Sequence, residues 1–231
     1  CGDDYLGTSW DYAERSALLR LANGTVLARF RRPTVTADRR NIGVVSRFLA
    51  DEIAKTKLPV GRFHVIPRGV EFPLGRDVDR PRENPPTFLV AARISADKGQ
   101  TVVIDAAARL HRQDPDREWK VRFVGKRLDA QHPGYYDGLH RRLADHGIAH
   151  RFEWRELVPR DDVLRMMRTA VAGISAATYG EPFANTIIET LGSGTPLIVS
   201  DVGSVHEVVT DETDGLIYSA EDSEALADRM H

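Results

Sequence analysis

The stretch that most constrains the fold is residues 171–200, in which two short apolar runs enclose a polar loop and an amphipathic segment. The runs VAGIS and PLIVS are rich in apolar and β-branched residues, and this composition predicts two buried strands. Between them, NTIIETL places Ile187, Ile188 and Leu191 on one face and so predicts a helix, which Gly-Ser-Gly would end. A strand, a helix and a second strand in this order are typical of a parallel β-sheet.

The loop and helix between these strands carry two glutamates. Glu181 would lie in the loop, and Glu189 would lie about two turns into the helix. Between them, the helix start would present unpaired backbone N–H groups, which hold phosphate without a basic side chain. These groups belong to Phe183, Ala184 and Asn185. Carboxylates accept hydrogen bonds from sugar hydroxyls, so this arrangement would suit a sugar nucleotide. The alternative is that both glutamates are solvated surface charges.

Apolar runs and amphipathic segments alternate from Thr87 to the end of the chain. This alternation predicts an α/β domain over residues 87–231, with a parallel, Rossmann-like sheet flanked by helices. The turn after its first strand lacks the G-x-G-x-x-G pattern, which argues against a dehydrogenase. Residues 1–72 contain one clear strand–helix–strand unit, which indicates part of a second Rossmann-like domain. Residues 73–86 are rich in proline and charge and predict the interdomain linker.

The turn after the first strand of this predicted domain reads ARISADKG. Arg93 and Lys98 would both lie at the carboxyl end of that strand, on the same edge of the sheet as Glu181. Two cations in this place could neutralise a diphosphate held by the loop that carries Glu181. An exposed arginine and an exposed lysine without a function are the alternative. Their joint position on the ligand edge favours the functional interpretation.

The composition argues against several kinds of partner and cofactor. A formal net charge of -2 gives no electrostatic reason to expect a nucleic-acid partner. No apolar run approaches the ~20 residues of a membrane span. A single cysteine excludes an intramolecular disulfide and fits a reducing compartment. The eight histidines are not spaced as metal ligands. We therefore expect a cytoplasmic protein without a structural metal.

The N-terminal region allows more than one interpretation. Cys1 would begin a mature bacterial lipoprotein, but a fragment of a longer protein is the favoured explanation. The basic run over residues 29–40 contains five arginines. It could make a peripheral contact with anionic lipid at the inner face of the membrane, or with a phosphorylated acceptor. A solvated basic face is the favoured alternative.

Several segments resemble the retaining glycosyltransferases of family 4. ARISADKG resembles their G-R-hydrophobic-x-x-x-K-G segment. GEPFANTIIETLGSGTPLIVSDVGSVHEVV resembles their E-x7-E region and the G-x-P-hydrophobic run that follows it. VVSRFLADEI and FHVIPRGVEF resemble the end of their first domain. The resemblance covers roughly residues 41–231.

This resemblance implies a GT-B fold, in which two Rossmann-like domains face a cleft and residues 87–231 bind a UDP- or GDP-sugar donor. Arg93 and Lys98 would contact the diphosphate and Glu181 the transferred sugar, so these three form the implied catalytic set. Glu189 would contact the ribose. The other implied donor-binding residues come from the helix start and from a strand end that would border the base: Phe183, Ala184, Asn185, Arg155, Leu157 and Val158.

The same resemblance implies no cofactor and no catalytic metal, because the cations and the helix start would stabilise the leaving nucleoside diphosphate. The acceptor would be a carbohydrate or a lipid-linked molecule. No segment matches the family's glycine-rich loop or its acceptor-side histidine, and the final return helix is missing, so we expect the chain alone to be inactive or nearly so. A non-catalytic nucleotide-sugar-binding module and a GT-B-fold sugar-nucleotide epimerase are the alternative functions.

Overall fold

The computed structural model describes residues 41–56, 61–70, 81–128 and 130–231 of the 231-residue chain. They belong to two compact units, Cys1–Pro67 and Arg68–His231, called the smaller and the larger unit below. The basic run over residues 29–40 lies outside the described residues, as do residues 73–80 of the predicted linker. The domain boundary at residues 73–86 therefore stays a prediction.

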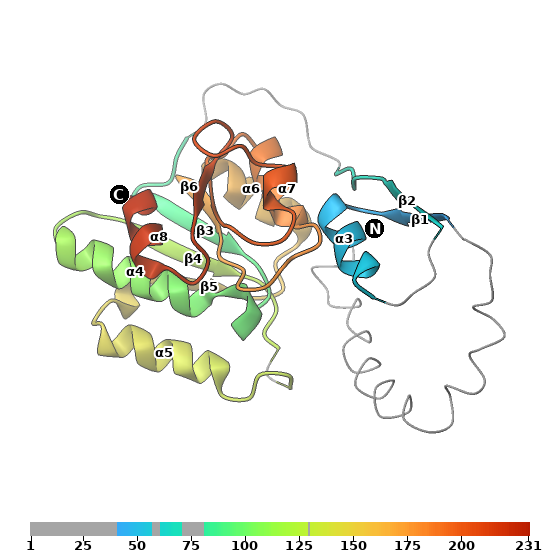
Figure 1. Ribbon diagram of the computed structural model, residues 1–231. Coiled ribbons are helices and arrows are strands. Elements are labelled where there is room, and N and C mark those ends of the chain that lie inside the picture. Colours follow the sequence, from blue (N-terminus) through green and yellow to red (C-terminus); the bar gives the residue numbers. More distant parts are fainter. Residues whose placement is uncertain (1–40, 57–60, 71–80, 129) are drawn as a thin grey trace. The chain divides into compact units, whose positions relative to one another are not determined.

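The described part of the smaller unit is a strand–helix–strand unit, as the sequence predicts (Figure 1). Strands β1 (Asn41–Val44) and β2 (Arg62–Val65) pair in parallel, and helix α3 (Arg47–Ala54) connects them. The hydroxyl of Ser46 accepts a hydrogen bond of 3.1 Å from the backbone N–H of Leu49. This contact caps the start of the helix and explains why α3 begins directly after β1.

In the larger unit, strands and helices alternate along the chain (Figure 1). The strands are β3 (Thr87–Ala91), β4 (Lys120–Val124), β5 (Phe152–Arg155), β6 (Ala172–Ser175), β7 (Leu197–Ser200) and β8 (Leu216–Tyr218). The α-helices are α4 (Gln100–Gln113), α5 (Tyr135–Asp145), α6 (Arg160–Thr169), α7 (Asn185–Gly192) and α8 (Ser223–Met230). Short 3-10 helices lie in the connections: η1 (Ala96–Lys98), η2 (Ala149–Arg151) and η3 (Val205–Glu207).

The strands of the larger unit form one parallel sheet in the order β5-β4-β3-β6-β7-β8. The chain adds strands outward from β3 on one side and outward from β6 on the other, so the strand order reverses between these two neighbours. Open parallel sheets bind ligands at such a point, outside the carboxyl ends of the strands. The predicted α/β fold, with a parallel sheet flanked by helices, is confirmed.

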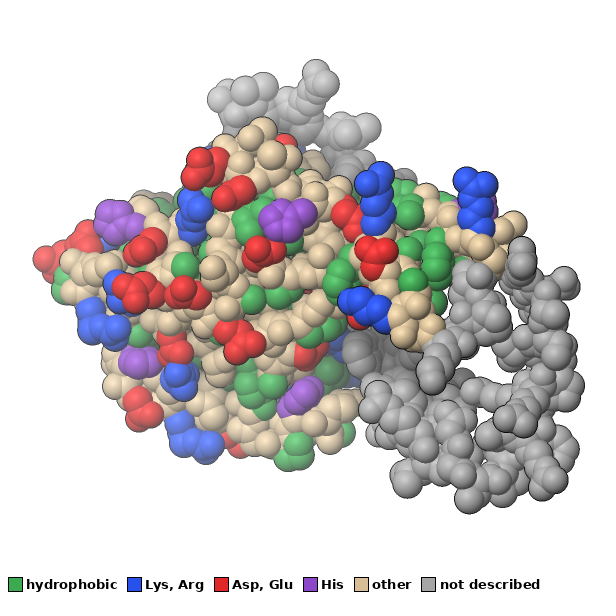
Figure 2. Space-filling view, viewed as in Figure 1, with side chains coloured by type: hydrophobic (Ala, Val, Ile, Leu, Met, Phe, Trp, Pro, Cys, Tyr) green, Lys and Arg blue, Asp and Glu red, His purple; other side chains and the backbone are tan. Residues whose placement is uncertain are grey.

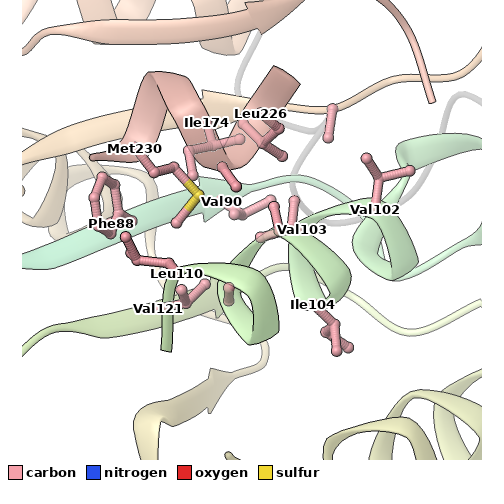
Figure 3. Packing of buried hydrophobic residues seen from close by; sticks show 14 of the residues in the cluster. Phe88, Val90, Val102, Val103, Ile104, Leu110, Val121, Ile174, Leu226 and Met230 are labelled. Atoms are coloured by element: carbon pink, nitrogen blue, oxygen red, sulfur yellow. The ribbon is translucent and has the colours of Figure 1, made fainter. Parts of the chain in front are cut away.

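Strand β3 is buried on both faces, which explains its uninterrupted apolar sequence. Phe88 and Val90 belong to one hydrophobic cluster, and Leu89 and Ala91 belong to another in which α6 takes part. Because successive strand residues point to opposite faces, helices on both sides hold β3 in place. Figure 3 shows the first cluster, to which α4 and α8 contribute Val103, Leu110, Leu226 and Met230.

An ion-pair network fastens the residues before β3 to the sheet. Arg122 of β4 donates hydrogen bonds of 2.7 and 2.8 Å to Glu83 and another of 2.9 Å to Glu153 of β5. Thr169 also donates to Glu83, at 2.9 Å, and Lys120 donates to Glu153, at 2.8 Å. Every carboxylate in this network therefore has more than one donor, and the segment that contains Glu83 is anchored to the larger unit.

A close backbone contact joins the loops that follow β3 and β6. Gly99 has a φ of +65°, and a Cβ atom at this position would lie 1.9 Å from the carbonyl oxygen of Ala176. Nearby, the backbone N–H of Thr178 donates a 3.0 Å hydrogen bond to the carbonyl of Asp97. Only glycine avoids both the left-handed strain and the overlap. The contact presses the residue before it, Lys98, against the loop that follows β6.

We predict that Gly99→Ala destabilises the larger unit much more than Gly147→Ala does. Both glycines have positive φ, +65° and +71°, but a Cβ on Gly147 would meet no atom within 4 Å. Gly147→Ala should therefore cost only the left-handed strain of about 1–2 kcal/mol, whereas Gly99→Ala adds a backbone overlap. Urea unfolding of the two variants measures the difference. Equal losses of stability would show that the Gly99–Ala176 contact does not constrain the loops.

We also predict that acid destabilises the larger unit, because Glu83 and Glu153 lose their charge. Burial alone raises the pKa of Glu83, but hydrogen bonds from Arg122 and Thr169 and the charge of Arg122 outweigh it, so the pKa lies below its ordinary value of 4.5. The pKa of Glu153 is likewise lowered. The hydrogen bond from Lys120 lowers it, burial opposes this effect, and Arg122 lowers it further. A carboxylate with a lowered pKa in the folded state stabilises the fold above pH 4.5, and this contribution is lost as the pH falls through the folded-state value.

Denaturant unfolding at pH 7 and at steps below pH 4.5 tests this expectation. The wild-type chain should lose more stability on acidification than Glu83→Gln, because the variant has no carboxylate to protonate at this place. Glu118→Gln, which changes an exposed glutamate, is the matched control and should follow the wild type. If Glu83→Gln and the wild type lose stability in parallel, the network does not contribute in the way proposed.

Candidate functional site

Two loops meet at the carboxyl edge of the sheet, where the strand order reverses. One follows β3 and contains Arg93 and Lys98, and the other follows β6 and contains Glu181. Gln100, which is fully buried, donates a 2.7 Å hydrogen bond to the carbonyl of Arg93, and Tyr135 donates to Gln100 at 3.1 Å. The loop after β3 is therefore held by a buried side chain of α4, which a residue of α5 contacts in turn.

Lys98 and Glu181 form an ion pair at the centre of this edge. The Lys98 Nζ atom lies 2.9 Å from Glu181 Oε1 and donates a second hydrogen bond of 2.9 Å to the Tyr179 hydroxyl. Lys98 is only 9% exposed. Burial lowers the pKa of Lys98, but the Glu181 carboxylate and the Tyr179 hydroxyl together raise it above its ordinary value. The ammonium group therefore keeps its charge at neutral pH.

Tyr179 is the second partner of the Lys98 ammonium group. The Nζ atom lies 4.8 Å from the centre of the tyrosine ring as well as 2.9 Å from its hydroxyl. Burial, together with the charge of Glu181, raises the pKa of Tyr179, and Lys98 opposes this rise without cancelling it. The hydroxyl is therefore neutral near pH 7 and can both accept from Lys98 and donate a hydrogen bond to another group.

Arg93 lies at the start of the same loop, on the same edge. Its Nη2 atom is 3.8 Å from Asp97 Oδ2, and most of its side chain is covered. The sequence expectation that Arg93, Lys98 and Glu181 share one edge matches their positions. Of the three, the structure joins Lys98 and Glu181 directly, whereas Arg93 is paired within its own loop.

Helix α7 starts immediately after the loop that carries Glu181. Its N-cap is Ala184, whose backbone is extended and whose side chain cannot cap the helix. Ala184 is buried, and Phe183 and Asn185 on either side of it are half-buried. No side-chain hydrogen bond from the N-cap therefore reaches the first turn of α7, and the phosphate cradle stays a prediction.

The loop after β7 supports the backbone of Glu181. A Cβ atom on Gly203 would lie 2.2 Å from the carbonyl oxygen of Glu181, and the N–H of Ser204 donates a 3.1 Å hydrogen bond to the same oxygen. The space enclosed beside Glu181 is small, about 10 Å³. A cavity of about 560 Å³ lies instead at the amino ends of the strands.

Glu189 lies in the second turn of α7 and is 2% exposed. The Nε and Nη2 atoms of Arg160 both donate to its Oε1 atom, at 3.1 and 3.0 Å. Arg160 is the first residue of α6, so this ion pair joins α6 to α7. The two glutamates predicted to act on one ligand thus have separate cationic partners.

The residues expected to border a nucleotide base lie farther along the same edge. Arg155 ends β5 and is exposed, and Val158 is half-buried against the cluster that α6 forms. Leu157 is 64% exposed and has a φ of 53°, which is uncommon for a bulky residue. Strand β4 separates β5 from β3. These residues therefore flank the Lys98–Glu181 pair and are not part of it.

Sequence reasoning missed Tyr179, Gln100 and Arg160. Each contacts a residue that the sequence did single out, but the contacts join positions 81, 7 and 29 residues apart. Tyr179 lies two positions before Glu181 and could have been found by proximity. No spacing rule connects Arg160 with Glu189, because the contact depends on how α6 packs beside α7.

The described surface carries charged side chains of both signs (Figure 2). On the face shown in Figure 2, acidic and basic side chains of the larger unit are interspersed, so this face carries no broad basic surface for nucleic acid. In residues 41–56, 61–70, 81–128 and 130–231, no group of three or more His, Cys, Asp or Glu side chains could hold a metal ion. Over the same residues, no helix combines the length and the apolar character needed to cross a membrane.

Known proteins resemble this chain in sequence. The chain is 30% identical over 181 residues to a D-inositol 3-phosphate glycosyltransferase from Nocardia farcinica, an alignment that covers 73% of this chain and 39% of that protein. It is 26% identical over 142 residues to a mannosylfructose-phosphate synthase from Agrobacterium fabrum, which covers 62% of this chain and 31% of that protein. The chain thus spans well under half the length of these relatives.

Solved structures share the fold. A glycosyltransferase from Rickettsia africae superposes with a TM-score of 0.70 at 20% identity, covering 88% of this chain and 55% of that one. HepE from Anabaena, in complex with UDP and glucose, superposes with a TM-score of 0.66 at 22% identity, covering 80% of this chain and 51% of that one. Residues 74–231 match the family model described as glycosyl transferases group 1. Because this match includes most of the chain, the chain belongs to the group 1 glycosyl transferases.

Proposed function

We propose that this chain carries the donor-binding part of a retaining glycosyltransferase of family 4, which transfers a hexose from a UDP- or GDP-sugar to an acceptor hydroxyl. The observation that carries the proposal is the Lys98–Glu181 pair, 2.9 Å apart, at the carboxyl edge where the strand order reverses. In a sugar nucleotide, the reacting bond joins the sugar to the diphosphate. A cation can bind the diphosphate, and a carboxylate in contact with that cation can bind the sugar. The family membership of residues 74–231 supports the same function.

In this proposal, positive charge at the edge stabilises the leaving group. Cleavage of the anomeric C–O bond increases negative charge on the β-phosphate of the nucleoside diphosphate. Lys98 and Arg93 supply fixed cations, and the chain at the start of α7 supplies backbone N–H donors at Phe183, at the N-cap Ala184 and at Asn185. Donors that are fixed before the reaction act most strongly where charge develops, so they can accelerate the chemical step as well as bind the donor.

The two glutamates recognise the sugars on either side of the diphosphate. Glu181 accepts hydrogen bonds from hydroxyls of the transferred hexose and tolerates the positive charge that grows on that sugar. Glu189 accepts from the ribose hydroxyls. The segment that begins at the end of β5, with Arg155, Leu157 and Val158, borders the base. Retention of configuration follows if the acceptor attacks the same face of the sugar that the nucleotide leaves.

The acceptor is proposed to be a carbohydrate or a lipid-linked molecule. The relatives named above, a D-inositol 3-phosphate glycosyltransferase and a mannosylfructose-phosphate synthase, favour a small hydroxylated acceptor. They also favour transfer over sugar-nucleotide epimerisation or over binding without catalysis. The cytoplasm is the proposed location because a single cysteine fits a reducing compartment. Low turnover by these 231 residues alone stays a prediction, as does the peripheral membrane contact.

Titration of the chain with UDP, GDP and ADP by calorimetry tests the donor site. One nucleotide should bind more tightly than the others, and Lys98→Met should weaken that binding about tenfold or more, because a charge-assisted hydrogen bond to phosphate is lost. Lys55→Met is the matched control, since Lys55 is exposed and belongs to the smaller unit. No binding by the folded wild type, or equal binding by wild type and Lys98→Met, would contradict the proposal.

Removal of divalent metal provides an independent prediction. If Lys98, Arg93 and the start of α7 supply the positive charge, then titration with the preferred nucleotide in excess EDTA should give an affinity within about twofold of that in Mg²⁺. A much weaker affinity in EDTA that Mg²⁺ restores would show that the diphosphate binds as a metal complex.

A further inference from the structure

Each glutamate of the E-x7-E pattern has a cationic partner from a different connection of the fold. Glu181 pairs with Lys98 of the loop after β3, and Glu189 pairs with Arg160 at the start of α6. The donor contains a diphosphate, which two unpaired carboxylates would repel. Because each carboxylate has a cation within 3.0 Å, the edge can use both as hydrogen-bond acceptors without presenting two uncompensated negative charges.

The carboxylate of the Arg160–Glu189 pair is more buried than that of the Lys98–Glu181 pair. The Glu189 side chain is 3% exposed, whereas that of Arg160 is 30% exposed. A carboxylate so covered would be strongly destabilised as an anion if it had no cationic partner. The two donors of Arg160 converge on the single atom Oε1, at 3.1 and 3.0 Å, so the guanidinium also restricts rotation of the carboxylate.

Arg160 also connects two regions of the edge that the proposed function assigns to one nucleoside. It follows directly after Leu157, Val158 and Pro159, the last of which is the N-cap of α6. This segment is the one proposed to border the base. Through Arg160, the same segment contacts Glu189, the residue proposed to bind the ribose. A nucleoside consists of these two parts joined by one bond, so the ion pair ties together the two surfaces that must match its geometry.

We propose that Arg160 is a positioning residue for ribose recognition: it holds the Glu189 carboxylate in one orientation, so that Glu189 accepts hydrogen bonds from the ribose hydroxyls. This inference rests on the proposed function and adds a residue to it. Because so little of the carboxylate is exposed, the orientation in which Arg160 holds it decides whether an oxygen is presented to the sugar. Arg160 acts through Glu189 and sets selectivity for a ribose with both hydroxyls.

The test compares nucleotides with and without ribose hydroxyls. Calorimetric titration uses UDP, GDP and ADP, each with its 2′,3′-dideoxy counterpart, on the wild type, Arg160→Gln, Arg160→Lys and Glu189→Gln. Arg165→Gln is the matched control, because Arg165 lies in the same helix with a side chain that is 73% exposed. Thermal unfolding of every variant shows whether it is folded under the conditions of the titration.

The wild type should bind the preferred nucleotide about tenfold or more tightly than its dideoxy counterpart, as expected for hydrogen bonds to a charged acceptor. Arg160→Gln and Glu189→Gln should each reduce this preference to about twofold or less, while the affinity for the dideoxy nucleotide changes little. Arg160→Lys should retain part of the preference, and Arg165→Gln should retain all of it. The loss is thus specific to the ribose and does not reflect a general weakening of the site.

The opposite outcomes overturn the inference in distinguishable ways. Arg160 has only a structural role if folded Arg160→Gln weakens the binding of the nucleotide and of its dideoxy counterpart equally. If Arg160→Gln does not fold, the same comparison is made with folded Arg160→Lys. If both variants keep the full ribose preference, Glu189 does not depend on Arg160. If the wild type binds nucleotides without any ribose preference, this inference fails while the donor site stands. If the wild type binds no nucleotide, the proposed function fails with it.

Discussion

The architecture of the site depends on the close approach of two loops where the strand order of the sheet reverses. Strands β3 and β6 are parallel neighbours, so the loops after them leave from the same edge. They touch because Gly99 has no side chain to collide with Ala176. This contact brings Lys98 within 2.9 Å of Glu181, although the two residues are 83 positions apart. Without this approach, the cation and the carboxylate would be separate surface charges.

Charge compensation is the second organising feature. The edge contains two carboxylates that are proposed to bind sugar hydroxyls, whereas the proposed ligand as a whole is an anion. Lys98 and Arg160 resolve this conflict, because each neutralises one glutamate and restricts its side chain. The raised pKa of Lys98 keeps the ammonium group protonated despite its burial. An edge of this kind can attract a diphosphate and still offer acceptors to the sugars on both sides of it.

The surrounding fold keeps these groups in place. Strand β3 is covered on both faces, and Arg122 holds the preceding segment through Glu83. The site residues lie on the connections between these buried elements. Leu157, which is exposed and has a positive φ, lies at the part of the edge proposed to face the base. The same scaffold is present in glycosyltransferases of known structure at 20–22% identity.

The sequence by itself determined the order and type of the elements, because buried strands and amphipathic helices produce local patterns of apolar residues. It also placed Arg93, Lys98 and Glu181 on one edge, since the carboxyl ends of parallel strands share an edge. Tertiary structure decided which side chains meet. The pairing of Glu189 with Arg160, the contact of Tyr179 with Lys98 and the support of Arg93 by Gln100 depend on how loops and helices pack in three dimensions. A sequence pattern records spacing along the chain, and these contacts arise from packing between segments whose separation no such pattern encodes.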